Sequence, residues 1–166
     1  MNFLKASEQV DKFNEEGNLL ARKALLTAIE IEPMYPSAYR ALAFTHLADV
    51  WLGVSKDPKL SIKKAFKLLE KVHLLDENSP GYYFILGQLL LLTRQHDKAI
   101  KSGKRAVSLS PNNATFLNAL ALIHRYYGEP EKALSLQKKA MRLNPYPESL
   151  YYTNLGNVYV SNEKYE

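Results

Sequence analysis

The chain has 166 residues, of which 46% are hydrophobic and 23% charged, and it carries a formal net charge of +5. This length accommodates one domain or two small ones, with enough core to fold without covalent cross-links. Cysteine is absent, which excludes a disulfide scaffold, a Cys-ligated zinc or iron–sulfur site and a thiol nucleophile, and which accords with a cytoplasmic protein.

Two amphipathic helices are predicted at the start of the chain, over residues 2–13 and 18–33. The first of them lacks the apolar stretch of a signal peptide. The longest apolar run, residues 82–92, spans eleven residues and is interrupted by Gly87 and Gln88. Since a helix that crosses a bilayer needs about 20 apolar residues, this run predicts a buried helix.

The middle of the chain repeats itself with a period of 34 residues. Residues 99–111 and 133–145 carry small residues at the same offsets, and each segment ends in a proline. A column of small residues extends this pattern through the chain at intervals of 44, 34 and 34 residues: Ala21, Ala65, Ala99 and Ala133. Small residues let two helices approach closely, and Pro111 and Pro145 stop a helix because proline cannot continue the hydrogen-bond ladder. Residues 128–131 predict the turn between the two helices of one period.

A 34-residue period built on Leu-Gly, Ala, Ala and Pro resembles the tetratricopeptide repeat (TPR). The resemblance covers nearly the whole chain and implies an all-α fold, a TPR superhelix (α-α solenoid) of about nine antiparallel helices, which stack because a lone repeat cannot bury its apolar face. The expected single TPR domain, residues 1–166, consists of repeats at about 1–35, 36–79, 80–113 and 114–147 and a truncated repeat at 148–166. The last predicted helix, residues 150–160, is apolar and has no second helix to cover it. We therefore expect a fragment of a longer protein, and the alternative is a natural end in one capping helix.

Ten extra residues distinguish the repeat at 36–79 from its neighbours. They predict a first helix about two turns too long, which breaks near Gly53 and is followed by a second helix that starts near Pro58. Such a helix would protrude past its neighbours and would carry the only tryptophan, Trp51, as a contact anchor. The alternative is that Trp51 folds back on its own loop.

The resemblance also implies where a partner would bind, because the first helices of TPR repeats line a concave groove. Counting along these helices gives the groove candidates Arg40, Phe44, Phe84, Gln88, Leu91, Asn118, Leu122, Arg125, Tyr126 and Asn157. The mixed lining favours a peptide or helix with hydrophobic anchors. The alternative is that Phe84, Leu91 and Leu92 pack against neighbouring helices. The columns that would form a clamp of Lys and Asn for an acidic C-terminus hold other residues here, so that ligand is disfavoured.

The excess positive charge lies in the middle of the chain, where residues 56–105 include eleven basic and five acidic residues. Two columns that lie about 200° round the helix from the small residues predict a basic stripe on the convex side. The members of this stripe are Lys23, Lys67, Lys71, Lys101, Arg105 and Lys139. Such a stripe suits a membrane surface, nucleic acid or an acidic domain. A solvated helix face is the simpler account, because no aromatic residues interleave with the basic ones and no nucleic-acid motif occurs.

The sequence contains no motif of catalytic or metal-binding residues. The four histidines include no pair at metal-ligand spacing, and neither a phosphate-binding glycine loop nor a Gly-x-Ser-x-Gly motif occurs. The sequence therefore predicts no enzyme activity, no metal site and no cofactor. Gly103 and Gln137 replace the usual large apolar residue of the repeat, which predicts locally loose packing.

Three segments narrow the resemblance further: AYRALA at 38–43, WLGVSKDP at 51–58 and RLNPYP at 142–147. They resemble the TPR region that follows the catalytic domains of bacterial class III adenylate and guanylate cyclases. The resemblance implies a non-catalytic scaffold in a bacterial signalling protein, which binds a protein or peptide or mediates self-association. No catalytic residue of a cyclase is present. The second hypothesis is a basic convex surface that docks anionic membrane or nucleic acid, as part of a transcriptional regulator.

Overall fold

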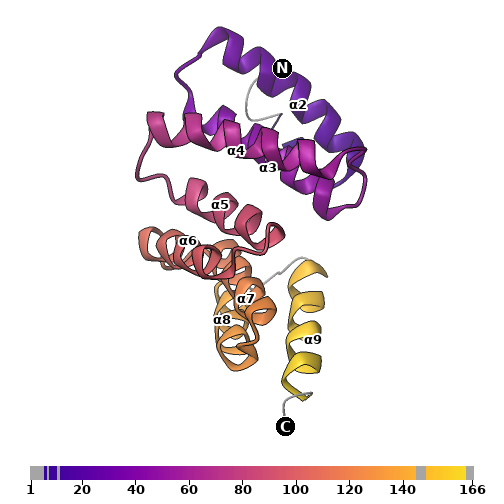
Figure 1. Cartoon of the computed structure of the whole chain (residues 1–166), viewed down its shortest axis with the longest axis vertical. Coiled ribbons are helices and arrows are strands. Elements are labelled where there is room, and N and C mark those ends of the chain that lie inside the picture. Colours follow the sequence, from indigo (N-terminus) through magenta and orange to yellow (C-terminus); the bar gives the residue numbers. More distant parts are fainter. Residues whose placement is uncertain (1–5, 7, 11, 145–148, 164–166) are drawn as a thin grey trace. The chain divides into compact units, whose positions relative to one another are not determined.

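The computed structural model describes residues 6, 8–10, 12–144 and 149–163, which form helices and short connections without a β-strand (Figure 1). The helices are α2 (Glu15–Ile31), α3 (Pro36–Trp51), α4 (Pro58–Leu75), α5 (Pro80–Leu92), α6 (His96–Leu109), α7 (Ala114–Tyr127), α8 (Pro130–Leu143) and α9 (Ser149–Glu163). The predicted all-α fold is confirmed. Within the first predicted helix, residues 6 and 8–10 are helical, while residues 2–5, 7 and 11, like the predicted stop at Pro145, lie outside the described residues. In the described part, no helix is both long and apolar enough to cross a membrane.

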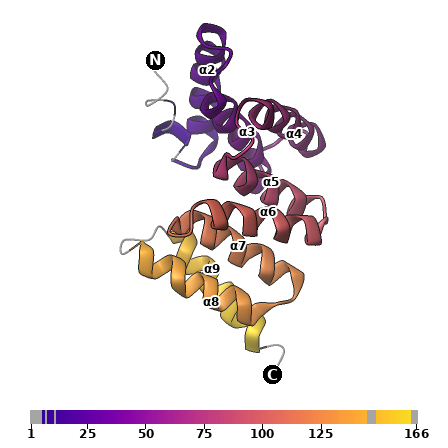
Figure 2. The same cartoon turned by 90° about the vertical axis from the view of Figure 1, so that its left-hand side faces the viewer.

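The chain divides into two compact units, residues 1–85 and 86–166, and the boundary falls inside α5. In the N-terminal unit, α3 packs against both α2 and α4. In the C-terminal unit, α7 packs against α6, α8 and α9, and α8 also contacts α9. Figure 2 shows α7 and α8 side by side, joined by a short turn.

Short polar residues and prolines set the helix ends. The side chains of Asn14, Asp57 and Asn113 accept hydrogen bonds from the first turns of α2, α4 and α7, which satisfies backbone donors that lack a partner within the helix. The predicted turn at 128–131 is confirmed, because α7 ends at Tyr127 and Gly128 adopts the left-handed conformation (φ 87°) before α8 begins.

The column of small residues forms the centre of the packing. Ala21, Ala65, Ala99 and Ala133 are all fully buried. In the N-terminal unit, Ala21 belongs to a core that also contains Leu25 and Leu42. These alanines keep the helix axes close, as the period of the sequence predicts.

The ten extra residues do not build a protruding helix, so that expectation is wrong. Helix α3 has 16 residues, against 14 in α7, and α4 has 18, against 14 in α6. The extra length is thus divided between α3, the loop that follows it and α4. The predicted break and restart are confirmed, because Gly53 has a left-handed φ of 71° and α4 starts at Pro58. Trp51 is half-buried, and its indole nitrogen is buried without a hydrogen-bond partner among the described residues.

Packing around Gly103 and Gln137 is tight, which corrects the expectation of a loose region. A Cβ atom on Gly103 would lie 2.8 Å from Leu120 Cδ1 and 3.2 Å from Ile123 Cδ1, so the side chains of α7 already fill this space. Gln137 is fully buried, and its Nε2 donates a hydrogen bond to the Tyr151 carbonyl oxygen at 2.9 Å. The glutamine therefore fastens α9 to α8 where the other repeats use apolar contact.

A second glycine is required by close approach. Gly17, in the first turn of α2, is buried, and a Cβ atom there would overlap the backbone oxygen of Gln9. In α9, by contrast, Gly156 is exposed and has no atom within 4 Å of its Cβ position. A side chain at position 17 would therefore clash with backbone, whereas one at position 156 would not.

Candidate functional site

Three phenylalanine rings form a row in the N-terminal unit. The rings of Phe44, on α3, and Phe84, on α5, stack with their centroids 6.2 Å apart, and the Phe13 ring is tilted against that of Phe44 with its centroid 6.3 Å away. All three side chains are half-buried. The sequence predicts Phe44 and Phe84 as groove residues, and it gives no indication of Phe13. We call Phe13, Phe44 and Phe84 the phenylalanine row.

The backbone at Phe13 is unusual. Its φ of 45° lies in the left-handed region, which non-glycine residues rarely adopt. A hydrogen bond from its N–H to the Val10 carbonyl oxygen (3.1 Å) holds the turn that places the ring. Backbone strain of this kind, on the order of 1–3 kcal/mol, persists where surrounding contacts enforce it, and it is common at binding sites.

Arg40 lies one helical turn before Phe44 on α3. Its side chain crosses Gly81, where a Cβ atom would lie 2.5 Å from Arg40 Cδ, so the glycine makes room for the arginine. Burial lowers the pKa of the Arg40 guanidinium, while Tyr35 and Asp76 raise it, and the group stays charged. Among the described residues the guanidinium has neither a hydrogen bond nor an ion pair. A desolvated cation therefore lies beside the phenylalanine row.

The groove candidates of the C-terminal unit do not form one open surface. Gln88, Leu91 and Asn118 are buried, and the Asn118 side chain accepts a hydrogen bond from Asn154 Nδ2 at 3.0 Å, which ties α7 to α9. Leu122 is half-buried. These positions therefore contribute to helix packing.

The remaining candidates of this unit lie nearer the surface. Tyr126 and Asn157 are exposed, and the half-buried Arg125 lies over the Tyr126 ring, with its guanidinium carbon 4.3 Å from the ring centroid. The Nε atom of Arg125 is buried and has no hydrogen-bond partner in the part of the chain that the structure describes. Among the groove candidates of this unit, the cation–π pair of Arg125 and Tyr126 is the arrangement most typical of a binding site.

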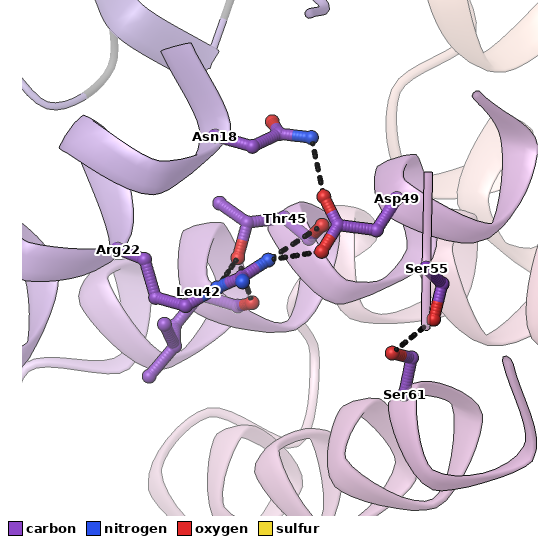
Figure 3. Close-up of polar contacts among 7 residues, drawn as sticks. All are labelled: Asn18, Arg22, Leu42, Thr45, Asp49, Ser55 and Ser61. Atoms are coloured by element: carbon purple, nitrogen blue, oxygen red, sulfur yellow. Dashed lines mark hydrogen bonds and ion pairs between the residues drawn. The ribbon is translucent and has the colours of Figure 1, made fainter. Parts of the chain in front are cut away.

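A polar cluster links α2 to α3 (Figure 3). The Arg22 guanidinium donates to Asp49 Oδ2 at 2.8 Å, to Thr45 Oγ1 at 3.2 Å and to the Thr45 carbonyl oxygen at 3.1 Å. Asn18 Nδ2 donates to the other carboxylate oxygen of Asp49 at 2.9 Å. Asn18 and Thr45 are fully buried, and the side chains of Arg22 and Asp49 are half-buried. We call Asn18, Arg22, Thr45 and Asp49 the polar cluster.

Comparison of the repeats could have revealed the polar cluster. The position of Arg22 corresponds to Phe66, Ile100 and Leu134 in the later repeats. Thr45 likewise corresponds to Leu89 and Ile123. Polar residues that replace apolar ones in two columns that face each other predict a buried polar pair. This arrangement fixes α2 on α3 by directional bonds in place of apolar contact.

All six members of the basic stripe are at least partly exposed. Lys71 is half-buried, and the other members (Lys23, Lys67, Lys101, Arg105 and Lys139) are exposed. A search of the described residues for three or more clustered His, Asp or Glu side chains that could hold a metal ion finds none.

Comparison with known proteins identifies the repeat. The tetratricopeptide repeat family model matches residues 80–113. Anaphase-promoting complex subunit 3 of Schizosaccharomyces pombe is 27% identical over 124 residues, which are 75% of this chain and 17% of that protein. The chain thus spans less than a fifth of the length of this curated relative.

Solved structures of similar fold include TTC0263, a thermophilic TPR protein of Thermus thermophilus, with a TM-score of 0.70 and 21% identity over 84% of this chain and 72% of that one. PilF of Pseudomonas aeruginosa has a TM-score of 0.66 and 19% identity, covering 96% and 72%. YrrB, whose structure is described as that of a TPR protein with an unusual peptide-binding site, has a TM-score of 0.57 and 20% identity, covering 91% and 72%. The likeness to these structures concerns the fold. The family model assigns residues 80–113 to one tetratricopeptide repeat, and the solved structures show that the chain shares the fold of TPR proteins.

Proposed function

We propose that this chain is a non-catalytic scaffold that binds a protein segment, or a second copy of itself, through the phenylalanine row. The observation that carries the proposal is the row itself, in which the Phe44 ring lies about 6 Å from two other rings, stacked on Phe84 and tilted against Phe13, while all three remain half-buried. Partly accessible aromatic rings on rigid helices are typical anchors for an apolar side chain of a partner.

The unpaired guanidinium of Arg40 adds a charge preference to this surface. Burial removes water from the group, and Asp76 acts on it through its charge without a hydrogen bond or ion pair, so a carboxylate of the partner would gain a charge-assisted hydrogen bond there. A segment with apolar side chains followed one turn later by an acidic residue would fit the row and Arg40 together.

Two relatives agree with a role in protein binding. The structure of YrrB is described by its peptide-binding site, and the relative from Schizosaccharomyces pombe is a subunit of a complex. The finer proposal, an accessory module of a bacterial signalling protein such as a nucleotide cyclase, rests on the sequence resemblance at residues 38–43, 51–58 and 142–147.

The test is affinity capture with matched variants. The immobilised chain and the variants Phe44→Ala with Phe84→Ala, Arg40→Ala and Leu26→Ala would be compared by quantitative mass spectrometry, and self-association would be followed by sedimentation velocity. Leu26 is a suitable control because it is an apolar residue of α2 that is 49% exposed and is not part of the row. We expect the row variants to lose a partner, or a dimer, that the control retains. Retention by all variants, with circular dichroism showing that they are folded, would contradict the proposal.

A further inference from the structure

Four lysines lie in a row along α4. Lys59, Lys63, Lys67 and Lys71 follow one another at intervals of four residues, so each lies about 6 Å further along the helix and about 40° further round it. The first three are exposed and Lys71 is half-buried. We call these residues the α4 lysine row, which spans about 18 Å.

The charge of this row is not neutralised in the described part of the chain. The ion pairs found there involve Arg22, His124 and Lys132, and none includes a lysine of the row. Glu70 is the only acidic residue of α4. Like charges four residues apart on a helix repel one another, so the row weakens α4 unless an acidic group from elsewhere approaches it.

Apolar side chains lie next to the lysines. A shallow, open hollow on α4 is lined by Lys59, Ile62, Lys63, Phe66, Lys67 and Glu70. Ile62 and Phe66 are half-buried at its edge. The sequence favours a solvated helix face because no aromatic residues interleave with the basic ones. The position of Phe66 beside Lys63 and Lys67 in this hollow weakens that argument.

We propose that the α4 lysine row with Ile62 and Phe66 binds an acidic amphipathic helix of a partner protein. Acidic residues at four-residue spacing on such a helix repeat at the same 6 Å interval as the lysines, and its apolar side chains would cover Ile62 and Phe66. A lipid surface fits less well, because the main apolar stripe of α4, which includes Leu69 and Val72, is buried and cannot insert. Nucleic acid fits less well because a single half-buried ring offers no stacking platform. This surface shares no residue with the phenylalanine row, so the two proposals can fail separately.

The test is a fluorescence anisotropy titration of the full chain with a labelled helical peptide that carries Glu at every fourth position and Leu beside it, long enough to lie along the row. We expect saturable binding that weakens about tenfold in Lys63→Glu with Lys67→Glu, since two attractive pairs become repulsive, and less in Phe66→Ala. Lys23→Glu with Lys139→Glu has the same change in net charge at exposed positions off α4 and should bind like the parent.

Each other outcome overturns the inference. Equal weakening by both double variants would mean that net charge alone attracts the peptide. Binding that depends on the row, but only to vesicles of equal parts phosphatidylcholine and phosphatidylserine or to a single-stranded oligonucleotide, would assign the row to a different class of ligand. Failure to bind any probe, with every variant folded by circular dichroism, would leave the row a solvated face.

Discussion

The polar cluster allows the sharpest test of how the N-terminal unit is held together. Replacing Asp49 by alanine removes both carboxylate oxygens, so that Arg22 loses its ion pair and Asn18 loses its acceptor. Among the described residues the buried Asn18 Oδ1 atom already has no hydrogen-bond partner, and the substitution leaves the amide nitrogen of that side chain unsatisfied as well. We expect α2 to dock less firmly on α3.

The magnitude follows from the two bonds. A charge-assisted bond contributes about 1.5–3 kcal/mol and a neutral one about 1 kcal/mol, and a buried donor left unpaired adds its desolvation cost. The side chains of Arg22 and Asp49 are 21% and 15% exposed, so water compensates part of the loss. We therefore expect Asp49→Ala to lower the free energy of unfolding by about 2–3 kcal/mol.

A second variant separates the stability lost when the polar cluster is broken from the net contribution of the cluster to stability. Asn18→Ile, Arg22→Ile, Thr45→Leu and Asp49→Thr together would install residues that the later repeats carry at the same positions. Well-packed apolar residues often replace a buried ion pair without loss of stability. This fourfold variant should come within about 1 kcal/mol of the parent, or exceed it.

Urea unfolding provides the assay. Helix content would be followed by circular dichroism, and the N-terminal unit by the fluorescence of Trp51, the only tryptophan, which lies on α3 two residues after Asp49. The reasoning is refuted if Asp49→Ala loses less than about 0.5 kcal/mol, which is typical of a surface change, or if the fourfold variant loses as much as the single one.

Three further changes follow from the contacts described above. Burial, with a smaller effect of nearby positive charge, lowers the pKa of His46 from 6.5 to about 4. Between these pH values the unfolded chain takes up a proton that the folded chain does not, so the free energy of unfolding should be highest above about pH 6.5 and fall toward pH 4. We expect a loss of about 1–2 kcal/mol, because the partial exposure of the ring keeps it small. His46→Leu should flatten this dependence in urea titrations across that range, and an unchanged slope would count against the assignment. Gly17→Ala should lower the thermal midpoint of unfolding by several degrees, because the new Cβ atom meets backbone. Gly156→Ala should leave the midpoint unchanged or raise it, because alanine has the better helix propensity. Similar shifts for both variants would contradict the packing argument. Gln137→Ala should lower the free energy of unfolding by about 2–3 kcal/mol and speed amide hydrogen exchange in α9, since it removes the hydrogen bond to the Tyr151 carbonyl oxygen. Slow exchange throughout α9 would show that this bond is dispensable.

The helical architecture could be predicted because its signals are local. The 34-residue period, the buried alanines and the turn at Gly128 all reflect positions where chain geometry permits few residue types. The length of α3 could not be obtained in this way, because ten extra residues can be divided among two helices and a loop without changing the periodicity of either helix.

The candidate site is only partly predictable. Phe44 and Phe84 follow from their column, while Phe13 depends on a left-handed backbone conformation that no residue type at this position signals. The sequence places Arg40 in the groove, but its lack of a partner becomes visible only with the neighbouring side chains in place. Conversely, the sequence predicts that Asn118 faces a ligand, and it instead hydrogen-bonds within the fold, because a polar residue at a helix interface can satisfy itself across that interface.

Helix α5 belongs to both compact units, since it runs unbroken from Pro80 to Leu92 across the boundary between Ile85 and Leu86. A helix of 13 residues is marginal by itself in water, so it depends on packing at both of its halves. Melting of either unit would therefore remove the packing of the half of α5 that belongs to that unit, and this half of the helix would fray.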